Sequence, residues 1–218
     1  MYEWSGLITV QRPVRPSIVA LEDELGLGKQ AKTLSKGQAE ATIAYLSTTR
    51  YPERNRLIFL LSAKAGLRAK EIAHLTWRMV CDAAGQIGHA IHLSDTASKG
   101  KSGRIIPMHA DVRAALIAYR RTLDKGSGDY VISTERSRYT SPQAIVNMFQ
   151  RWYRHLGFVG CSSHSGRRTF ITGAARKIST VGGSIRDVQA LAGHSNLRTT
   201  QRYIEESADA QRKVVQQL

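Results

Sequence analysis

The 218-residue sequence contains few cysteines and no long hydrophobic run, and its acidic residues are few beside its basic ones. Its two cysteines, Cys81 and Cys161, lie far apart and form neither a CxxC pair nor a Cys/His pattern with the spacing of metal ligands. This favours two reduced thiols in a reducing compartment over a disulfide. The N-terminus lacks the apolar core of a signal peptide, and the longest aliphatic run, residues 57–61, is far too short to cross a bilayer. We therefore expect a soluble, cytoplasmic protein with no membrane partner.

Positive charge is what the sequence has in excess. The 32 lysines and arginines outnumber the 17 aspartates and glutamates, which gives a formal net charge of +15 and an isoelectric point near 10.3. So basic a chain favours an anionic partner, and nucleic acid is the first candidate. A ribosomal protein or a membrane-surface protein has the same balance, so charge alone leaves several classes open.

The pattern of apolar residues and turn signals predicts one domain of the α+β class, mainly α-helical, over residues 35–218. Residues 1–34 are too few to fold as a separate domain and are expected to form an N-terminal arm or extension. Short extended runs between glycine-containing turns predict a small three-stranded antiparallel sheet. The expected strands are residues 79–82, 90–93 and 104–107, and the expected helices are 54–64, 69–77, 111–123 and segments that begin at Ser35, Ser141, Ser163, Ser184 and Asn196. Gly66 is expected to stop the helix over residues 54–64, and Gly193 the helix that begins at Ser184.

Four segments carry unusual polar residues beside turns or helix ends. They are residues 65–71 with Arg68 and Glu71, residues 98–104 with Lys99, Lys101 and Arg104, residues 164–168 with His164, Arg167 and Arg168, and residues 191–203 with His194 and Tyr203. Each segment has an ordinary explanation: a solvated Arg–Glu pair, a hairpin tip, a capping histidine beside surface arginines, or a helix-end histidine and a core tyrosine. The basic turn and the basic helix start also suit a bound phosphate, because helix N-termini favour anions.

The ordered set is more specific than its parts. An Arg, a Lys in a β-turn, His-x-x-Arg, and Gly-His with a Tyr nine residues after the His follow one another along the chain. This order resembles the tyrosine recombinase (phage integrase) family from about Ser35 to the C-terminus. The strongest stretch is LAGHSNLRTTQRY at residues 191–203, and GLRAKE at residues 66–71 supports it. The resemblance implies the catalytic-domain fold of that family. It also implies a site-specific recombinase that cleaves and rejoins DNA strands, as in integration, excision or inversion by a mobile element.

The resemblance also assigns a role to each residue of the pattern. The implied catalytic set is Arg68, Lys99, His164, Arg167, His194 and Tyr203. Arg68 and Arg167 would clamp the scissile phosphate, and Tyr203 would be the nucleophile. Lys101 competes with Lys99 for the role of the hairpin lysine, because the hairpin register is open. Glu71 matches an acidic position that braces the active site. The expected DNA-binding residues are Lys101, Arg104, Arg168, Arg198 and Arg202, and neither a metal nor another cofactor is expected.

These residue types suit phosphoryl transfer. Two guanidinium groups can meet the charge that grows on the non-bridging oxygens with paired N–H bonds, which a lysine cannot reproduce. A tyrosine phenol has a pKa near 10, so it needs neighbouring cations or a base such as His164 to lose its proton. The departing 5′ oxygen needs a proton that Lys99 can give, and His194 would donate to a non-bridging oxygen. The resulting 3′-phosphotyrosine stores the bond energy, so rejoining needs neither ATP nor a metal.

Several features depart from the family pattern. Gly166 stands where an aliphatic residue is common inside His-x-x-Arg, which is expected to loosen that helix start. Residues 181–184 read as a short insertion. No room is expected before Ser35 for the separate helical domain with which many members clamp the other face of DNA. An amphipathic C-terminal helix is expected at residues 208–218, and it packs either on its own domain or on a neighbouring protomer.

The implied partners are double-stranded DNA, a homotetramer assembled on DNA from protomers that are monomeric in solution, and an accessory DNA-bending protein, with a location at the nucleoid. Three other functions stay open: a type IB topoisomerase, a non-catalytic DNA-binding regulator on the same scaffold, and a basic RNA-binding protein. The stretch at residues 191–203 favours a recombinase over a topoisomerase. A complete catalytic set argues against a purely binding protein, and RNA binding explains the charge but none of the ordered motifs.

Overall fold

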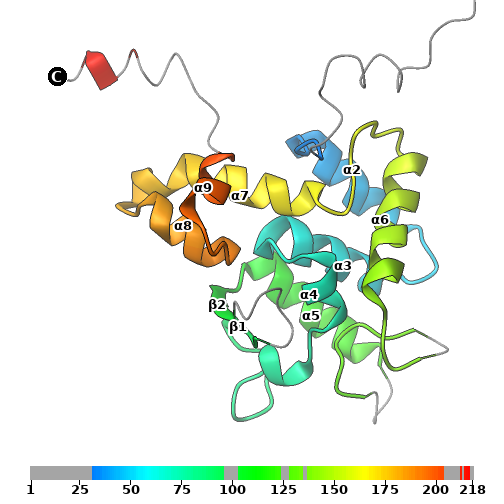
Figure 1. The fold of residues 1–218 in the computed structure, drawn as a ribbon. Helices are drawn as coiled ribbons and strands as arrows, with labels where there is room; N and C mark the ends of the chain where they lie inside the picture. Colours follow the sequence, from blue (N-terminus) through cyan, green and yellow to red (C-terminus); the bar gives the residue numbers. More distant parts are fainter. Residues whose placement is uncertain are drawn as a thin grey trace, which may run out of the picture. The chain divides into compact units, whose positions relative to one another are not determined.

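The computed structural model of the protein describes residues 31–95, 103–123, 128–134 and 137–203, together with 212 and 214–216. Within them, helices predominate and a small antiparallel sheet lies beside helix α8 (Figure 1). None of the described helices is long and apolar enough to cross a membrane. The elements are α2 (Lys36–Ser47), α3 (Pro52–Ala65), α4 (Ala69–Ala73), the 3₁₀ turn η1 (Trp77–Met79), β1 (Ala90–Leu93), β2 (Arg104–Pro107), α5 (Ala110–Arg121), α6 (Pro142–His155), α7 (Ser165–Lys177), the 3₁₀ turn η2 (Ile178–Val181), α8 (Ile185–Ala192) and α9 (Leu197–Gln201).

Local sequence signals set the ends of several helices. Ser35 caps α2 and Ser141 caps α6, each through a side-chain oxygen that accepts a backbone N–H of the first turn. Gly66 ends α3 and Gly193 ends α8, with φ of 66° and 60° in the left-handed region that favours glycine. These predicted boundaries are confirmed. Both glycines lie directly before segments that carry candidate catalytic residues.

Two other helix ends differ from the prediction. Helix α7 has His164 rather than Ser163 at its N-cap position, and the His164 side chain makes no capping hydrogen bond. The hydroxyl of Ser165 accepts the backbone N–H of Ser162 in a turn just before the helix. Helix α9 ends before Tyr203, whose N–H donates to a carbonyl three residues back, as in the tightened last turn of a helix. Tyr203 therefore follows α9 instead of lying within it.

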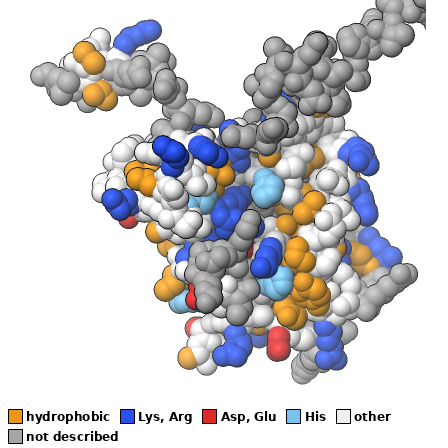
Figure 2. Space-filling model, in the orientation of Figure 1, with side chains coloured by type: hydrophobic (Ala, Val, Ile, Leu, Met, Phe, Trp, Pro, Cys, Tyr) orange, Lys and Arg blue, Asp and Glu red, His pale blue; other side chains and the backbone are white. Residues whose placement is uncertain are grey.

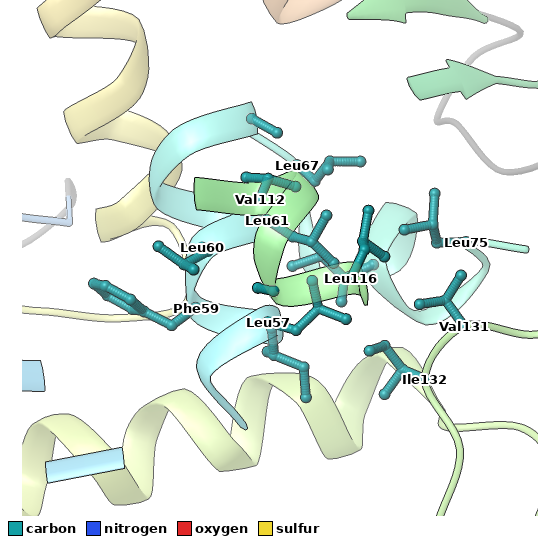
Figure 3. Packing of buried hydrophobic residues seen from close by; sticks show 14 of the residues in the cluster. Leu57, Phe59, Leu60, Leu61, Leu67, Leu75, Val112, Leu116, Val131 and Ile132 are labelled. Carbon is teal, nitrogen blue, oxygen red and sulfur yellow. The ribbon is translucent and has the colours of Figure 1, made fainter. Parts of the chain in front are cut away.

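Helix α3 lies at the centre of the main hydrophobic core (Figure 3). Its residues Leu57 and Leu61 are fully buried, and it packs against α5, which contributes Leu116, and against α7. Each fully buried leucine stabilises the fold by about 1.5–3 kcal/mol relative to an exposed one. The C-terminal end of α3, and with it the turn at Gly66, is thereby held on a rigid support.

The expected three-stranded sheet is wrong, because within the described residues the sheet has two strands. β1 and β2 pair antiparallel and have the predicted bounds. Residues 79–82 form no strand: η1 occupies their start, and Cys81 makes only an isolated bridge to Ile87. The backbone N–H groups of residues 79–81 already donate to carbonyls at the start of this 3₁₀ turn, so they cannot donate to a neighbouring strand.

A smaller hydrophobic cluster joins the last part of the described chain. Ile171 of α7 packs with Val188 and Ala192 of α8, and all three side chains are buried. Tyr203 packs against this cluster as a partly buried member. The nucleophile predicted from the sequence is thus held by the same two helices that carry Arg167 and lead to His194.

Residues 31–34, which the sequence assigns to the extension, contact the domain. The N–H of Leu34 donates to the side-chain oxygen of Thr169 at 2.8 Å, and the N–H of Lys32 donates to the carbonyl of Gly160 at 3.0 Å. Leu34 is also a buried member of the main core.

Candidate active site

Glu71 holds two arginines at the start of α4. Its carboxylate accepts from the backbone N–H and from Nη1 of Arg68, both at 2.8 Å, and from both terminal nitrogens of Arg104. The Glu71 side chain has no exposed surface. Burial alone raises the pKa of this carboxyl, but the hydrogen bonds and charges of Arg104, and then of Arg68, outweigh it and hold the pKa below its ordinary value. The resemblance assigns Glu71 to bracing the site, and these contacts suit that role.

Arg167 lies on the first turn of α7 and is 3% exposed. Its Nη1 donates to the carbonyl of Gly66 at 2.5 Å, and its Nη2 donates to the carbonyl of Ala192 at 2.7 Å and to Nε2 of His194 at 3.0 Å. Burial, followed by the charge of Arg68, lowers the pKa of Arg167 to about 9, so it stays positive at neutral pH. The guanidinium joins the end of α3 to the end of α8.

His194 follows the left-handed Gly193 and is 9% exposed. Its Nδ1 lies 2.9 Å from Oγ1 of Thr200. Burial, followed by the charge of Arg167, lowers the pKa of His194 to about 4, so the ring is neutral at pH 7. Because Arg167 has no acceptor, Nε2 must accept, and the hydrogen-bond network places the ring proton on Nδ1.

Tyr203 stacks on His194. The ring centroids are 5.6 Å apart and the ring planes differ by 23°. The guanidinium of Arg168 lies 6.0 Å from the centre of the tyrosine ring. The ring of Tyr203 is therefore next to the histidine that contacts Arg167.

His164 and Arg68 form the open side of the site. The side chain of His164 is exposed at the N-terminus of α7, and that of Arg68 is 23% exposed. Partial burial, then the charges of Arg167 and Arg68, lower the pKa of His164, so the neutral form that can accept a proton is favoured. The structure thus gathers Arg68, His164, Arg167, His194 and Tyr203, from segments far apart in the sequence, around one position.

The family model described as "Phage integrase family" matches residues 32–209. The chain belongs to the phage integrase family. Among its relatives, tyrosine recombinase XerA of Thermococcus onnurineus is 29% identical over 184 residues, which cover 84% of this chain and 61% of the relative. Tyrosine recombinase XerC of Xanthomonas axonopodis pv. citri is 28% identical over 151 residues, or 69% of this chain and 46% of the relative. The match thus spans 61% or less of the length of these two relatives.

Solved structures show the same fold. A crystal structure of XerA recombinase matches with a TM-score of 0.66 at 26% identity, over 85% of this chain and 64% of that one. The Tn1549 transposon integrase, solved with a circular intermediate DNA, matches with a TM-score of 0.68 at 19% identity, over 87% and 67%. The chain therefore has the catalytic-domain fold of tyrosine recombinases, mainly helical with a small antiparallel sheet.

Arg104, which the sequence predicts to bind DNA, is instead buried and makes its hydrogen bonds within the protein. Its side chain is 6% exposed, and besides Glu71 it binds the carbonyl of Leu191 through Nε at 2.9 Å. It also packs over Gly193: a Cβ added there would lie 2.7 Å from Nη1 of Arg104. The left-handed φ and this close approach both require glycine before His194.

The other predicted DNA-binding residues lie in varied surroundings. Arg198 and Arg202 are exposed on and after α9, whereas Arg168 is half-buried and donates to the carbonyl of Ala31 at 3.2 Å. Figure 2 shows Lys, Arg and His side chains clustered around the middle of the face in view, with few acidic side chains among them. Lys99 and Lys101 lie outside the described residues, as does most of the helix expected at residues 208–218.

Gly166, the departure inside His-x-x-Arg, lies where α7 crosses α3. A Cβ at this position would lie 2.6 Å from Oγ of Ser62 and 3.2 Å from the backbone nitrogen of Ala63. Glycine therefore allows the close approach of the two helices that brings Arg167 to the carbonyl of Gly66. No local pattern in the sequence indicates this packing, because the contact is made with Ser62, which is distant in the chain.

The described residues contain no group of three or more His, Cys, Asp and Glu side chains that could hold a metal ion. A hollow of about 450 Å³ opens beside His194, on the side of the sheet. It is lined by Gly103, Arg104, Arg186, Gln189, Ala190, Gly193, His194 and Ser195. His194 thus borders open space as well as the buried arginine.

Proposed function

We propose that this chain acts as a site-specific DNA recombinase that cleaves and rejoins strands through a 3′-phosphotyrosine on Tyr203. The observation that carries the proposal is the stacking of Tyr203 on His194, whose Nε2 accepts a hydrogen bond from Arg167. A protein that only binds DNA has no need for a phenol beside a histidine and a buried arginine. A non-catalytic regulator and a DNA-relaxing topoisomerase are the alternatives that the experiment below separates.

The two arginines supply the phosphate clamp. Arg167 is fixed by the carbonyls of Gly66 and Ala192, and Arg68 is fixed by Glu71, so both charges are in position before DNA binds. Donors already in place need no reorganisation when charge grows on the non-bridging oxygens, and removing one such donor costs on the order of 100- to 1000-fold in rate. His194 can add a third hydrogen bond from Nε2 once that nitrogen carries a proton.

Strand cleavage then exchanges one ester for another. The phenol oxygen of Tyr203 bonds to phosphorus, its proton passes to His164, and the bond from phosphorus to the 5′ oxygen breaks. The 5′ oxygen leaves with a proton from Lys99 or Lys101, the lysines that the resemblance assigns to this step. Attack by the 5′-hydroxyl of a second strand reverses every transfer, so rejoining needs no outside energy source.

The relatives and structural neighbours support DNA as the partner. The curated relatives are named tyrosine recombinases, and solved neighbours include a transposon integrase with DNA and a lambda integrase dimer bound to a core site. We propose double-stranded DNA as the substrate, a tetramer on DNA as the active assembly, an accessory DNA-bending protein and a location at the nucleoid. The net charge of +15 suits such a partner.

A covalent trapping assay tests the proposal. The protein is incubated with nicked duplexes that cover the DNA flanking its gene, because a nick lets the cleaved 5′ fragment leave and traps the phosphotyrosine. The expected result is a protein–DNA band that survives SDS and disappears with protease, and that Tyr203→Phe does not give. Tyr45→Phe, which changes a tyrosine of α2, is the matched control and should form the band.

Other results point elsewhere. DNA binding without a covalent band on any duplex would contradict catalysis and favour the non-catalytic regulator. A band together with relaxation of supercoiled DNA, but without exchanged strands in a two-duplex reaction, would favour the topoisomerase.

A further inference from the structure

The hydroxyl of Thr200 lies directly against the ring of His194. Its Oγ1 is 2.9 Å from Nδ1, and Thr200 is completely buried. The carbonyl of the same residue accepts the backbone N–H of Tyr203 at 3.0 Å. One residue of α9 therefore contacts the histidine through its side chain and the nucleophile through its main chain.

His194 has to change its role at Nε2 during the proposed reaction. Without DNA, Nε2 accepts a hydrogen bond from Arg167, and the ring proton lies on Nδ1. To donate to a non-bridging oxygen of the phosphate, Nε2 must carry a proton instead. If the ring stays neutral, Nδ1 then becomes an acceptor, so its partner must become a donor.

The charges around His194 favour a neutral ring. Arg167 of α7, Arg68 before α4 and Arg104 of β2 all disfavour the imidazolium, and the negative charge of Glu71 is already bound by two of them. Burial acts in the same direction, and the pKa of about 4 reflects both. In the protein without DNA, the surroundings of His194 therefore favour a change of tautomer over a change of charge.

A hydroxyl is the partner that such a change requires. Thr200 can accept from Nδ1–H or donate to a bare Nδ1 by rotating one hydrogen, whereas a carboxylate or a backbone carbonyl can only accept. A backbone carbonyl at this position would therefore hold the ring in one tautomer only. Valine has the same shape as threonine, so packing alone does not require a hydroxyl at this buried position.

We propose that Thr200 is a positioning residue for strand cleavage, whose hydroxyl reverses its hydrogen bond with Nδ1 of His194 when Nε2 turns from Arg167 to the scissile phosphate. This rests on the function proposed above.

Three substitutions separate this role from simple packing. Thr200→Val keeps the shape and removes the hydroxyl, Thr200→Ser keeps the hydroxyl and removes a methyl group, and Thr199→Val changes the exposed neighbour in the same helix.

The measurements are the single-turnover rate of covalent complex formation on the nicked duplexes, with protein in excess, and the dissociation constant for the same duplexes without a nick. We expect Thr200→Val to slow the covalent step by about 10- to 100-fold, the loss of one hydrogen bond to a charged or polarised group, with DNA binding unchanged. Thr200→Ser should recover most of the rate, and Thr199→Val should match the unchanged chain.

The same substitution in a His194→Ala background gives the decisive comparison. If Thr200 acts through His194, then Thr200→Val has no further effect once the histidine is gone. The proposal would be overturned if Thr200→Val slowed the reaction equally with His194 present and with His194→Ala, or if it did not slow the reaction of the otherwise unchanged chain. If the unchanged chain forms no covalent complex with any duplex, the proposed function fails and the role of Thr200 fails with it.

A spectroscopic measurement covers a Thr200→Val variant that does not fold. The ¹⁵N chemical shifts of the His194 ring are recorded in Tyr203→Phe, free and bound to an uncleaved duplex. We expect the proton on Nδ1 in the free protein and on Nε2 in the complex. One tautomer in both states, or an imidazolium in the complex, would overturn the proposal.

Discussion

Both carboxylate oxygens of Glu71 bind the guanidinium of Arg104, at 2.9 Å from Oε1 to Nη1 and 3.1 Å from Oε2 to Nη2. The two side chains are 0% and 6% exposed. Through Nε, Arg104 also binds the carbonyl of Leu191, so one side chain ties β2 to α4 and to the end of α8. Arg68 shares Glu71 with Arg104, and His194 follows the end of α8, so the Glu71–Arg104 pair supports both sides of the candidate active site.

Replacing Arg104 should destabilise the fold. Arg104→Ala leaves the buried carboxylate of Glu71 with one of its two arginines, and breaking a buried ion pair in this way costs about 3–5 kcal/mol. Urea unfolding measures the change. Arg198→Ala, which removes an exposed arginine, should change the free energy of unfolding by no more than about 0.5 kcal/mol. An Arg104→Ala protein of unchanged stability with weakened DNA binding would show that Arg104 serves as a DNA contact.

Acid should destabilise the protein in two successive ranges of pH. The pKa of His194 is lowered from 6.5 to about 4, so between these values the unfolded chain binds a proton that the folded chain does not. The pKa of Glu71 is lowered from 4.5, so below that value the unfolded carboxylate again takes up its proton first. By linkage, both contributions are complete above about pH 6.5 and are lost as the pH falls. In urea unfolding across this range, His194→Asn should flatten the upper part of the curve and Glu71→Gln the lower part, and unchanged slopes would contradict these assignments.

A side chain at Gly166 should force α3 and α7 apart. The Cβ of Gly166→Ala would lie 2.6 Å from Oγ of Ser62, and such overpacking typically costs about 1–3 kcal/mol. Gly173→Ala in the same helix is the matched control: a Cβ there meets nothing within 4 Å, so this variant should gain about 0.5–1 kcal/mol. Adding Ser62→Ala to Gly166→Ala should recover part of the loss. Equal effects of the two glycine substitutions on thermal unfolding would contradict the close approach.

DNA binding should weaken steeply with salt, because each neutralised phosphate releases counterions. The exposed Arg198 and Arg202 are predicted to be phosphate contacts. Arg198→Gln or Arg202→Gln should each reduce the slope of log K against log salt by about 1, whatever the DNA sequence. Fluorescence anisotropy at several salt concentrations measures the slope, with Gln201→Ala as a control on the same surface. A slope that neither arginine affects would remove both from the interface.

The sequence indicated which segments lie together better than it indicated the contacts among their side chains. Helix ends at Gly66 and Gly193 carry local signals, and so does the motif with His194 and Tyr203, which is why these features could be read in advance. The third strand was wrong because the apolar residues near Cys81 suit a 3₁₀ turn as well as a strand. The burial of Arg104 depends on Glu71, a partner 33 residues away in the chain, and no local pattern reports such a pairing.

The central claim is that Tyr203 becomes joined to DNA through a 3′ phosphate. The most direct measurement is mass spectrometry of the covalent complex after digestion with nuclease and protease, together with exonuclease treatment that reports which DNA end is blocked. The account predicts a nucleotide attached through phosphate to Tyr203 in the peptide that contains it, with the 3′ end blocked and the 5′ end free. An adduct on another residue, a blocked 5′ end, or no adduct on duplexes that the protein binds would contradict it.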